Sequence, residues 1–185
     1  MAAESSEEIT FDAIYAAYFR PVYNYAYYRL RDIAAADDLT AQIFERVLRN
    51  FHRYRPERAP FPVWLWTIAR RAVQTYAARQ RLIRWLPLAG AAERPSGHSP
   101  EEIVLARLDQ QALVAAFATL SAREQDLVAL KFVGGLTNRQ IAAVAGLSES
   151  NVGTIVARTL RKLRGLLADP HHEQEDAYVK SIISR

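Results

Sequence analysis

Arginines and aromatic residues are interleaved through residues 45–84, a combination suited to binding nucleic acid. The stretch holds ten arginines but only two acids, Glu45 and Glu57, so its local net charge is +8. Guanidinium groups bind phosphates through paired hydrogen bonds, and aromatic rings stack on exposed bases. The pattern therefore predicts a surface for single-stranded nucleic acid, with these aromatic residues among the arginines: Phe51, Tyr54, Phe61, Trp64, Trp66 and Tyr76.

Packing is the competing explanation for these rings. We expect Phe51 and Trp64 in the hydrophobic core. Trp66 shares one helix flank with Arg70 and Gln74, and its position suits DNA contact and packing about equally.

A second pattern, in residues 137–163, predicts a helix-turn-helix. Ala142 is the small residue required where two short helices cross, and Gly146, four positions later, tolerates a positive φ in the turn. The second helix then exposes Ser150, Asn151, Thr154 and Arg158, followed by a basic end at Arg161, Lys162 and Arg164. Such a helix can enter the major groove of DNA. An ordinary helical hairpin with a solvated basic face is the alternative, but spacing, caps and charge together favour DNA binding.

Residues 35–51 form an amphipathic helix with two distinct faces. Leu39, Ile43, Val47 and Phe51 make the apolar stripe. The opposite face carries Asp38, Gln42, Glu45 and Arg49. By default such a face is simply exposed to solvent. The more specific interpretation is that it docks on a partner protein.

The elements that position these residues are all predicted to be helical. Helices are expected over residues 11–30, where Pro21 kinks or divides the helix, and over 35–51 and 63–81. Four N-caps mark further helices starting near residues 100, 122, 138 and 149, at Ser99, Ser121, Thr137 and Ser148. Residues 86–99 are rich in proline and glycine and form a flexible linker.

The predicted fold is therefore all-α, with two small helical domains joined by a flexible linker and a helix-turn-helix in the second. The expected boundaries are a tail at 1–8, a domain at 9–85, the linker at 86–99, a domain at 100–168 and a tail at 169–185. The 185-residue chain has no cysteine, and its net charge is +4. It lacks a signal sequence and a membrane-spanning run of about 18 apolar residues, so we expect a cytoplasmic or nucleoid-associated protein without membrane insertion.

Almost the entire chain, residues 9–168, resembles the extracytoplasmic-function group of bacterial sigma factors. Residues 36–44 are similar to the acidic motif of that family, and residues 62–71 to its tryptophan-led helix. Residues 120–124 and 137–163 are similar to its helix-turn-helix domain. The sequence departs from the family pattern where Arg71 replaces a common asparagine and Thr75 a common aspartate.

The resemblance implies core RNA polymerase and promoter DNA as partners, with an anti-sigma factor as a restraining partner, and neither catalysis nor a cofactor. It places polymerase docking on Asp38, Gln42, Glu45 and Arg49. It places the −10 element on Tyr54, Arg55, Arg58, Trp66, Arg70, Arg71 and Gln74. It places the −35 element on Ser150, Asn151, Thr154, Arg158, Arg161 and Lys162.

Two other functions compete with this one. A stand-alone helix-turn-helix regulator would bind duplex DNA without polymerase and would lack a basic, aromatic first domain. An enzyme is disfavoured because the four histidines, His52, His98, His171 and His172, do not form a catalytic set or a convincing metal site.

Overall fold

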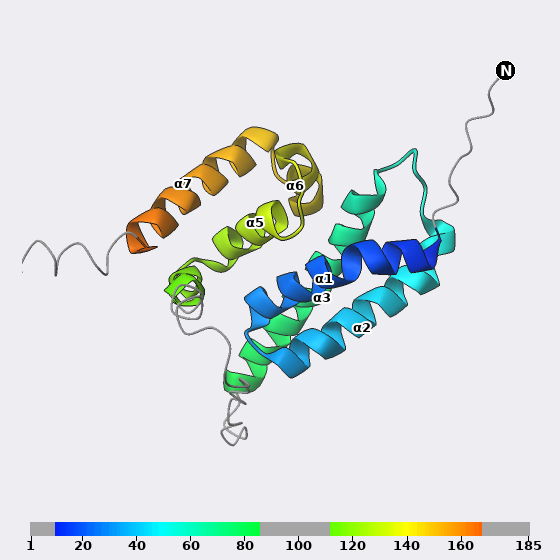
Figure 1. The fold of residues 1–185 in the computed structure, drawn as a ribbon, viewed down its shortest axis with the longest axis horizontal. Coiled ribbons are helices and arrows are strands. Elements are labelled where there is room, and N and C mark those ends of the chain that lie inside the picture. The colour runs from blue at the N-terminus through cyan, green and yellow to red at the C-terminus, as the bar shows by residue number, and fades with distance from the viewer. Residues whose placement is uncertain (1–9, 86–111, 168–185) are drawn as a thin grey trace, which may run out of the picture.

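The computed structural model describes residues 10–85 and 112–167, which form helices joined by short connections (Figure 1). The elements are α1 (Phe11–Leu30), α2 (Ile33–Asn50), the 3-10 helix η1 (Phe51–Arg53), α3 (Phe61–Trp85), α5 (Ala122–Phe132), α6 (Asn138–Ala145) and α7 (Glu149–Leu167). Residues 112–118 are also helical. The described residues contain no strand, so the all-α prediction is confirmed.

Several predictions lie outside the described residues. These are the linker at 86–99, the helix start near residue 100, and the tails at 1–8 and 169–185.

Local capping explains where the first two helices begin and end. The Thr10 hydroxyl accepts a hydrogen bond from the Ala13 amide at 3.3 Å, and the Asp32 carboxylate accepts one from the Ala35 amide at 2.9 Å. Between the helices, Arg31 adopts a left-handed conformation, with φ of 56°, which ends α1. Pro21 lies inside α1 without dividing it, contrary to one sequence expectation. Buried residues on both sides of Pro21, among them Ile14 and Val22, anchor the helix by tertiary packing.

Helix α3 is longer than predicted at both ends. It begins at Phe61, so Pro62 falls in the first turn, where its missing N–H leaves no hydrogen bond unmade. It runs to Trp85, whereas the sequence pattern suggested an end near residue 81. Helices α1, α2 and α3 pack on one another around Ile43, Leu65 and Val73, all fully buried.

The C-terminal helices have the capping that the sequence predicted. Ser121 and Glu124 form a reciprocal capping box at α5, and Thr137 and Gln140 form another at α6. The Ser148 hydroxyl accepts a hydrogen bond from the Asn151 amide at 3.2 Å, at the start of α7. These caps confirm the predicted helix starts at 122, 138 and 149.

The N-terminal unit (α1–α3) and the C-terminal unit (residues 112–167) share one continuous hydrophobic core. Helix α5 packs against α1, and α6 packs against α3, while α7 lies on the outer side of α5 and α6 (Figure 1). Among the described residues, none of the helices combines the length and the hydropathy that crossing a membrane would require.

Candidate nucleic-acid interface

Helices α6 and α7 form the predicted helix-turn-helix. Gly146 ends α6 in the left-handed region, with φ of 69°, so the chain turns sharply into α7. Val152 and Ile155 hold α7 in the core, and Ala142 is buried on α6. All six residues predicted to contact the −35 duplex are exposed: Ser150, Asn151, Thr154, Arg158, Arg161 and Lys162. The outer face of α7 is therefore accessible along its whole length.

The basic end of α7 has a short-range electrostatic partner. Hydrogen bonds from the side chain and backbone of Ser121 lower the pKa of Glu124, and the charges of Lys162 and Arg158 lower it further. The Lys162 ammonium also donates a hydrogen bond to the Thr119 carbonyl at 3.3 Å. Lys162 therefore contacts the backbone that precedes α5, whereas Arg161 lies on the exposed face of α7.

The polar face of α2 is exposed at all four predicted docking positions, Asp38, Gln42, Glu45 and Arg49. Arg49 and Glu45 form an ion pair at 2.6 Å, with 73% and 55% of their side chains exposed. A pair this exposed contributes little to stability. This ion pair therefore does little to hold the described helices together.

The residues predicted to bind the −10 strand fall into two separate groups. Tyr54 packs in an aromatic cluster with Phe61 and Trp64, with ring centroids 5.4 and 5.3 Å away. Burial raises the pKa of Tyr54, with a further contribution from Glu57. Nearby, Arg55 and Arg58 are exposed, and Arg55 donates hydrogen bonds to two carbonyls of its own loop. Arg71, on α3, is also exposed.

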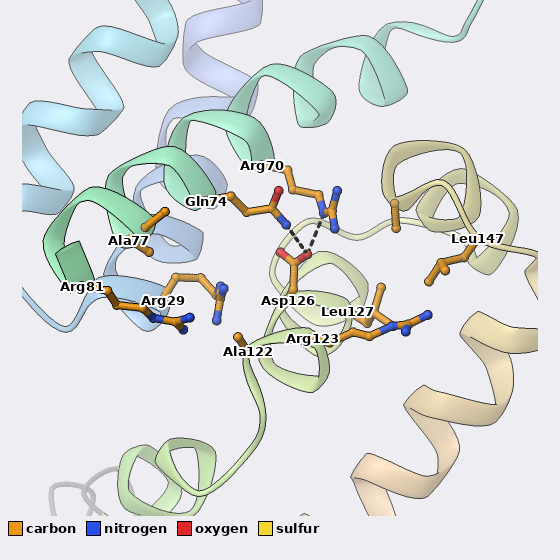
Figure 2. Close-up of a pocket in the computed structure, with 12 residues that line it drawn as sticks. Arg29, Arg70, Gln74, Ala77, Arg81, Ala122, Arg123, Asp126, Leu127 and Leu147 are labelled. Carbon is orange, nitrogen blue, oxygen red and sulfur yellow. Dashed lines mark hydrogen bonds and ion pairs between the residues drawn. The ribbon is translucent and has the colours of Figure 1, made fainter.

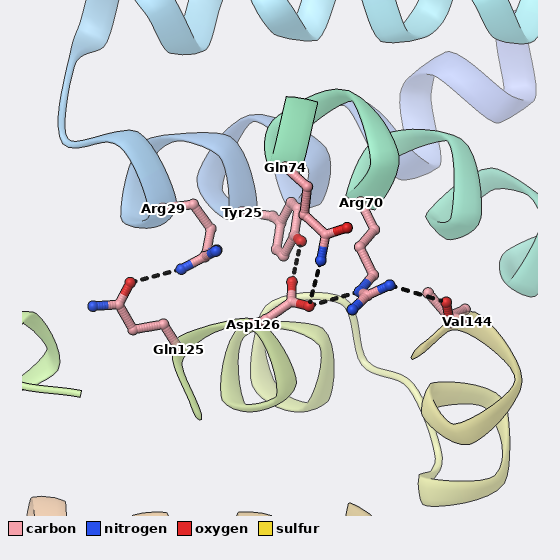
Figure 3. Close-up of polar contacts among 7 residues, drawn as sticks. All are labelled: Tyr25, Arg29, Arg70, Gln74, Gln125, Asp126 and Val144. Atoms are coloured by element: carbon pink, nitrogen blue, oxygen red, sulfur yellow. Dashed lines mark hydrogen bonds and ion pairs between the residues drawn. The ribbon is translucent and has the colours of Figure 1, made fainter. Parts of the chain in front are cut away.

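The second group, Trp66, Arg70 and Gln74, lies at four-residue spacing on α3. Arg70 and Gln74 point toward Asp126 on α5 (Figure 3). Trp66 is fully buried, with its ring edge-on to that of Tyr25 at 5.4 Å. The Arg70 Nε donates to the Asp126 carboxylate at 2.6 Å, and the Gln74 amide donates to the same oxygen at 3.4 Å. In this conformation Trp66 is buried and the Arg70 side chain is only 20% exposed, whereas Gln74 remains exposed.

Asp126 and its donor Tyr25 are residues at this site that sequence reasoning missed. Asp126 is the more informative of the two. Asp126 is only 1% exposed. Aspartate is rarely buried unless it has a partner, so this burial requires one. The helical spacing could have revealed it, because Asp126 lies on the same face of α5 as the buried Leu130, four residues later. An acid on the apolar face of a helix indicates a specific cationic or hydroxyl partner.

A cleft of about 460 Å³ opens between the two units beside Asp126 (Figure 2). Asp126 is the acid among its lining residues. Four arginines also line it: Arg29, Arg70, Arg81 and Arg123. The cleft is therefore strongly positive, with Arg70 and Arg81 coming from the arginine-rich stretch and Arg29 and Arg123 from outside it.

Comparison with known proteins gives two family matches in chain order. Sigma-70 region 2 matches residues 14–83, and Sigma-70 region 4 matches residues 110–163. The first covers α1–α3 and the second covers the helix-turn-helix unit. Each match therefore coincides with one of the two helical units.

Individual relatives agree with these matches. The ECF RNA polymerase sigma factor BldN of Streptomyces coelicolor is 34% identical over 172 residues, which are 90% of this chain and 64% of BldN. The ECF RNA polymerase sigma factor SigK of Mycobacterium sp. (strain KMS) is 30% identical, with 84% of this chain and 81% of SigK covered. The fold resembles that of the sigma factor RpoE in its complex with the anti-sigma factor NepR from Bartonella quintana, with a TM-score of 0.63 and 17% identity, over 87% of this chain and 98% of RpoE. The chain therefore belongs to the sigma-70 family, in its extracytoplasmic-function group.

Proposed function

We propose that this chain binds core RNA polymerase and directs it to promoters, as a sigma factor without catalytic activity of its own. The observation that carries the proposal is the joint presence, in order, of regions 2 and 4 of the sigma-70 family on one chain. The two regions provide separate basic surfaces, and the outer face of α7 is exposed as duplex binding requires.

In this proposal each surface has one task. The exposed α2 face around Asp38 and Gln42 docks on the polymerase. Helix α7 reads the −35 duplex, with its N-terminal half at base edges and Arg158 and Arg161 on phosphates. Residues 54–74 bind the opened −10 strand.

The alternative, a stand-alone helix-turn-helix regulator, is less well supported. One helix-turn-helix buries little DNA surface, and α7 offers short side chains at Ser150 and Thr154. The first unit is moreover the match to region 2 of sigma-70 rather than to a ligand-sensing or dimerisation domain. We therefore infer that promoter-specific binding requires polymerase.

Two further expectations belong to the same proposal. The protein acts in the cytoplasm at the nucleoid, where polymerase and promoters are. We also expect an anti-sigma factor as a restraining partner, because RpoE, which has a similar fold, was solved in a complex with one.

The test is retention of the full-length chain on core RNA polymerase, followed by transcription from a randomised promoter library. We expect co-purification and a defined set of enriched promoters. Asp38→Arg should weaken co-purification without changing the fold, since Asp38 is exposed. Asp12→Arg makes the same charge change at an exposed position on α1 and serves as the control. Sequence-specific nanomolar binding to duplex DNA without polymerase would instead favour the stand-alone regulator.

A further inference from the structure

The buried carboxylate of Asp126 joins the two helical units. Its side chain comes from α5, whereas its three donors come from the N-terminal unit: the Tyr25 hydroxyl on α1, and Arg70 and Gln74 on α3 (Figure 3). A second bridge lies beside it, where Arg29 on α1 donates to the Gln125 side chain at 2.7 Å. These side-chain contacts exist only while the two units are together.

Burying a carboxylate is unfavourable unless hydrogen bonds and opposite charge compensate for its lost hydration. Here Tyr25 bonds one carboxylate oxygen, and Arg70 and Gln74 bond the other, so among the described residues that loss is compensated by donors across the boundary between units. Burial, with the charge of Asp126 next, raises the pKa of Tyr25 well above its ordinary value, so the hydroxyl keeps its proton and remains a donor. When the units separate, water can hydrate the carboxylate instead.

Apolar packing reinforces the same boundary. A Cβ atom at Gly134, just after α5, would lie 3.1 Å from ring carbons of Trp66, so the backbone of the C-terminal unit closes directly over that indole. Tyr28 and Phe117 also meet across the boundary, with centroids 6.1 Å apart. The polar bridge therefore sits within a packed interface.

The interface covers part of one proposed binding surface, the −10 surface, and leaves the other two surfaces open. Trp66 and Arg70 lie against the C-terminal unit, whereas Gln74 reaches Asp126 but stays exposed. Asp38 on α2 and Asn151 on α7 remain exposed. In this state the chain can present its polymerase-docking and −35 faces, but Trp66 and most of the Arg70 side chain are withheld from a single strand.

We propose that Asp126 is the centre of an autoinhibitory latch, which holds the two units closed and masks Trp66 and Arg70 until the C-terminal unit leaves α3. The structural part of this proposal, the closure itself, is independent of function. The masking of the −10 surface rests on the proposed function.

The absence of cysteine allows closure to be measured directly. Ala16 on α1 and Ala157 on α7 are both exposed, so Ala16→Cys with Ala157→Cys places two spin labels on the full chain, one on each unit. We expect a narrow distance distribution for the parent and a broad, longer one for Asp126→Asn, which keeps the shape of the side chain but removes its charge. Because a hydrogen bond to a charged group is strong, the open-to-closed ratio should rise about 10- to 100-fold, or about 1.4–2.7 kcal/mol.

Tyr25→Phe is a second variant, which removes one donor and leaves Asp126 in place; it should open the chain to a smaller extent. Helical content by circular dichroism verifies that each variant is folded. A parent chain that is already broadly distributed, or distances unchanged in both variants, would overturn the latch.

Masking is tested by fluorescence anisotropy with a pool of randomised single-stranded oligodeoxynucleotides. Asp126→Asn should bind the pool about 10-fold more tightly or better, because the competent state is more populated. Glu149→Gln makes the same charge change at an exposed position and controls for general attraction to DNA. An open chain with no gain beyond that control would overturn the masking. Failure of the parent to bind core polymerase would refute the sigma-factor function alone, because the distance measurement does not depend on it.

Discussion

The turn of the helix-turn-helix depends on one backbone conformation, at Gly146. With φ of 69°, this residue lies in the left-handed region, and a Cβ built there would meet no atom within 4 Å. A substitution to alanine therefore adds backbone strain without a steric clash. The left-handed conformation costs an L-residue about 1–2 kcal/mol, and the reduced entropy of the unfolded chain offsets part of this. We expect Gly146→Ala to lower the free energy of unfolding by about 1 kcal/mol.

The same chemical change at Gly165 provides the matched control. Gly165 lies in α7 without a positive φ, and its Cβ would also meet nothing within 4 Å. Gly165→Ala should therefore stabilise the chain, by roughly 0.5–1 kcal/mol, because alanine is the better helix former. Gly146→Asn should fall between Gly146→Ala and the parent, since asparagine tolerates the left-handed region.

Urea unfolding of the full chain, followed by circular dichroism, measures these differences from the shift in midpoint at constant slope. The two alanine variants should move the midpoint in opposite directions. If Gly146→Ala is neutral or stabilising while Gly165→Ala behaves as expected, the left-handed turn is not required and the assigned geometry of the helix-turn-helix is wrong.

Three further predictions concern charge and burial. Arg158→Ala should weaken binding of the holoenzyme to promoter DNA across sequences, and should reduce the slope of log K against log salt by about 0.9; an unchanged slope would remove Arg158 from the phosphate contacts. The pKa of Glu124 is lowered in the folded state, so the ionised side chain stabilises the fold. That contribution is present above the pKa of an unfolded glutamate, about 4.3, and is lost as the pH falls through the lower pKa of the folded state. Glu124→Gln should therefore flatten that part of the acid dependence of the unfolding midpoint, and an identical profile would contradict the capping argument. Trp66→Ala should lower the free energy of unfolding by about 3–5 kcal/mol, since the indole is fully buried. A fully stable Trp66→Ala variant would show that the indole is not a core residue. Strand opening on normal and pre-melted promoters is therefore better measured with the milder variant Trp66→Phe.

Much of the architecture could be predicted because its causes are local in the chain. Hydroxyl caps at Ser121 and Thr137 and the apolar stripe through Leu39 and Ile43 depend on residues within a few positions of one another. The exposed face of α7 could be predicted for the same reason, because burial of Val152 and Ile155 determines which residues of the helix point outward. The roles of these exposed residues in binding polymerase and DNA remain predictions, because exposure alone does not identify a partner.

The amino-acid sequence by itself determined the helices, their main caps, the helix-turn-helix spacing and the concentration of arginine among aromatic residues, since each arises from short-range periodicity or composition. Only the tertiary structure decided that Arg70 and Gln74 point toward α5, and that Asp126 receives its hydrogen bonds from Tyr25 and from α3. Tyr25 and Asp126 are 101 positions apart, and no local rule relates such residues. Their contact depends on how two separately amphipathic units bury their remaining apolar surface against each other, which is a property of the packed core as a whole.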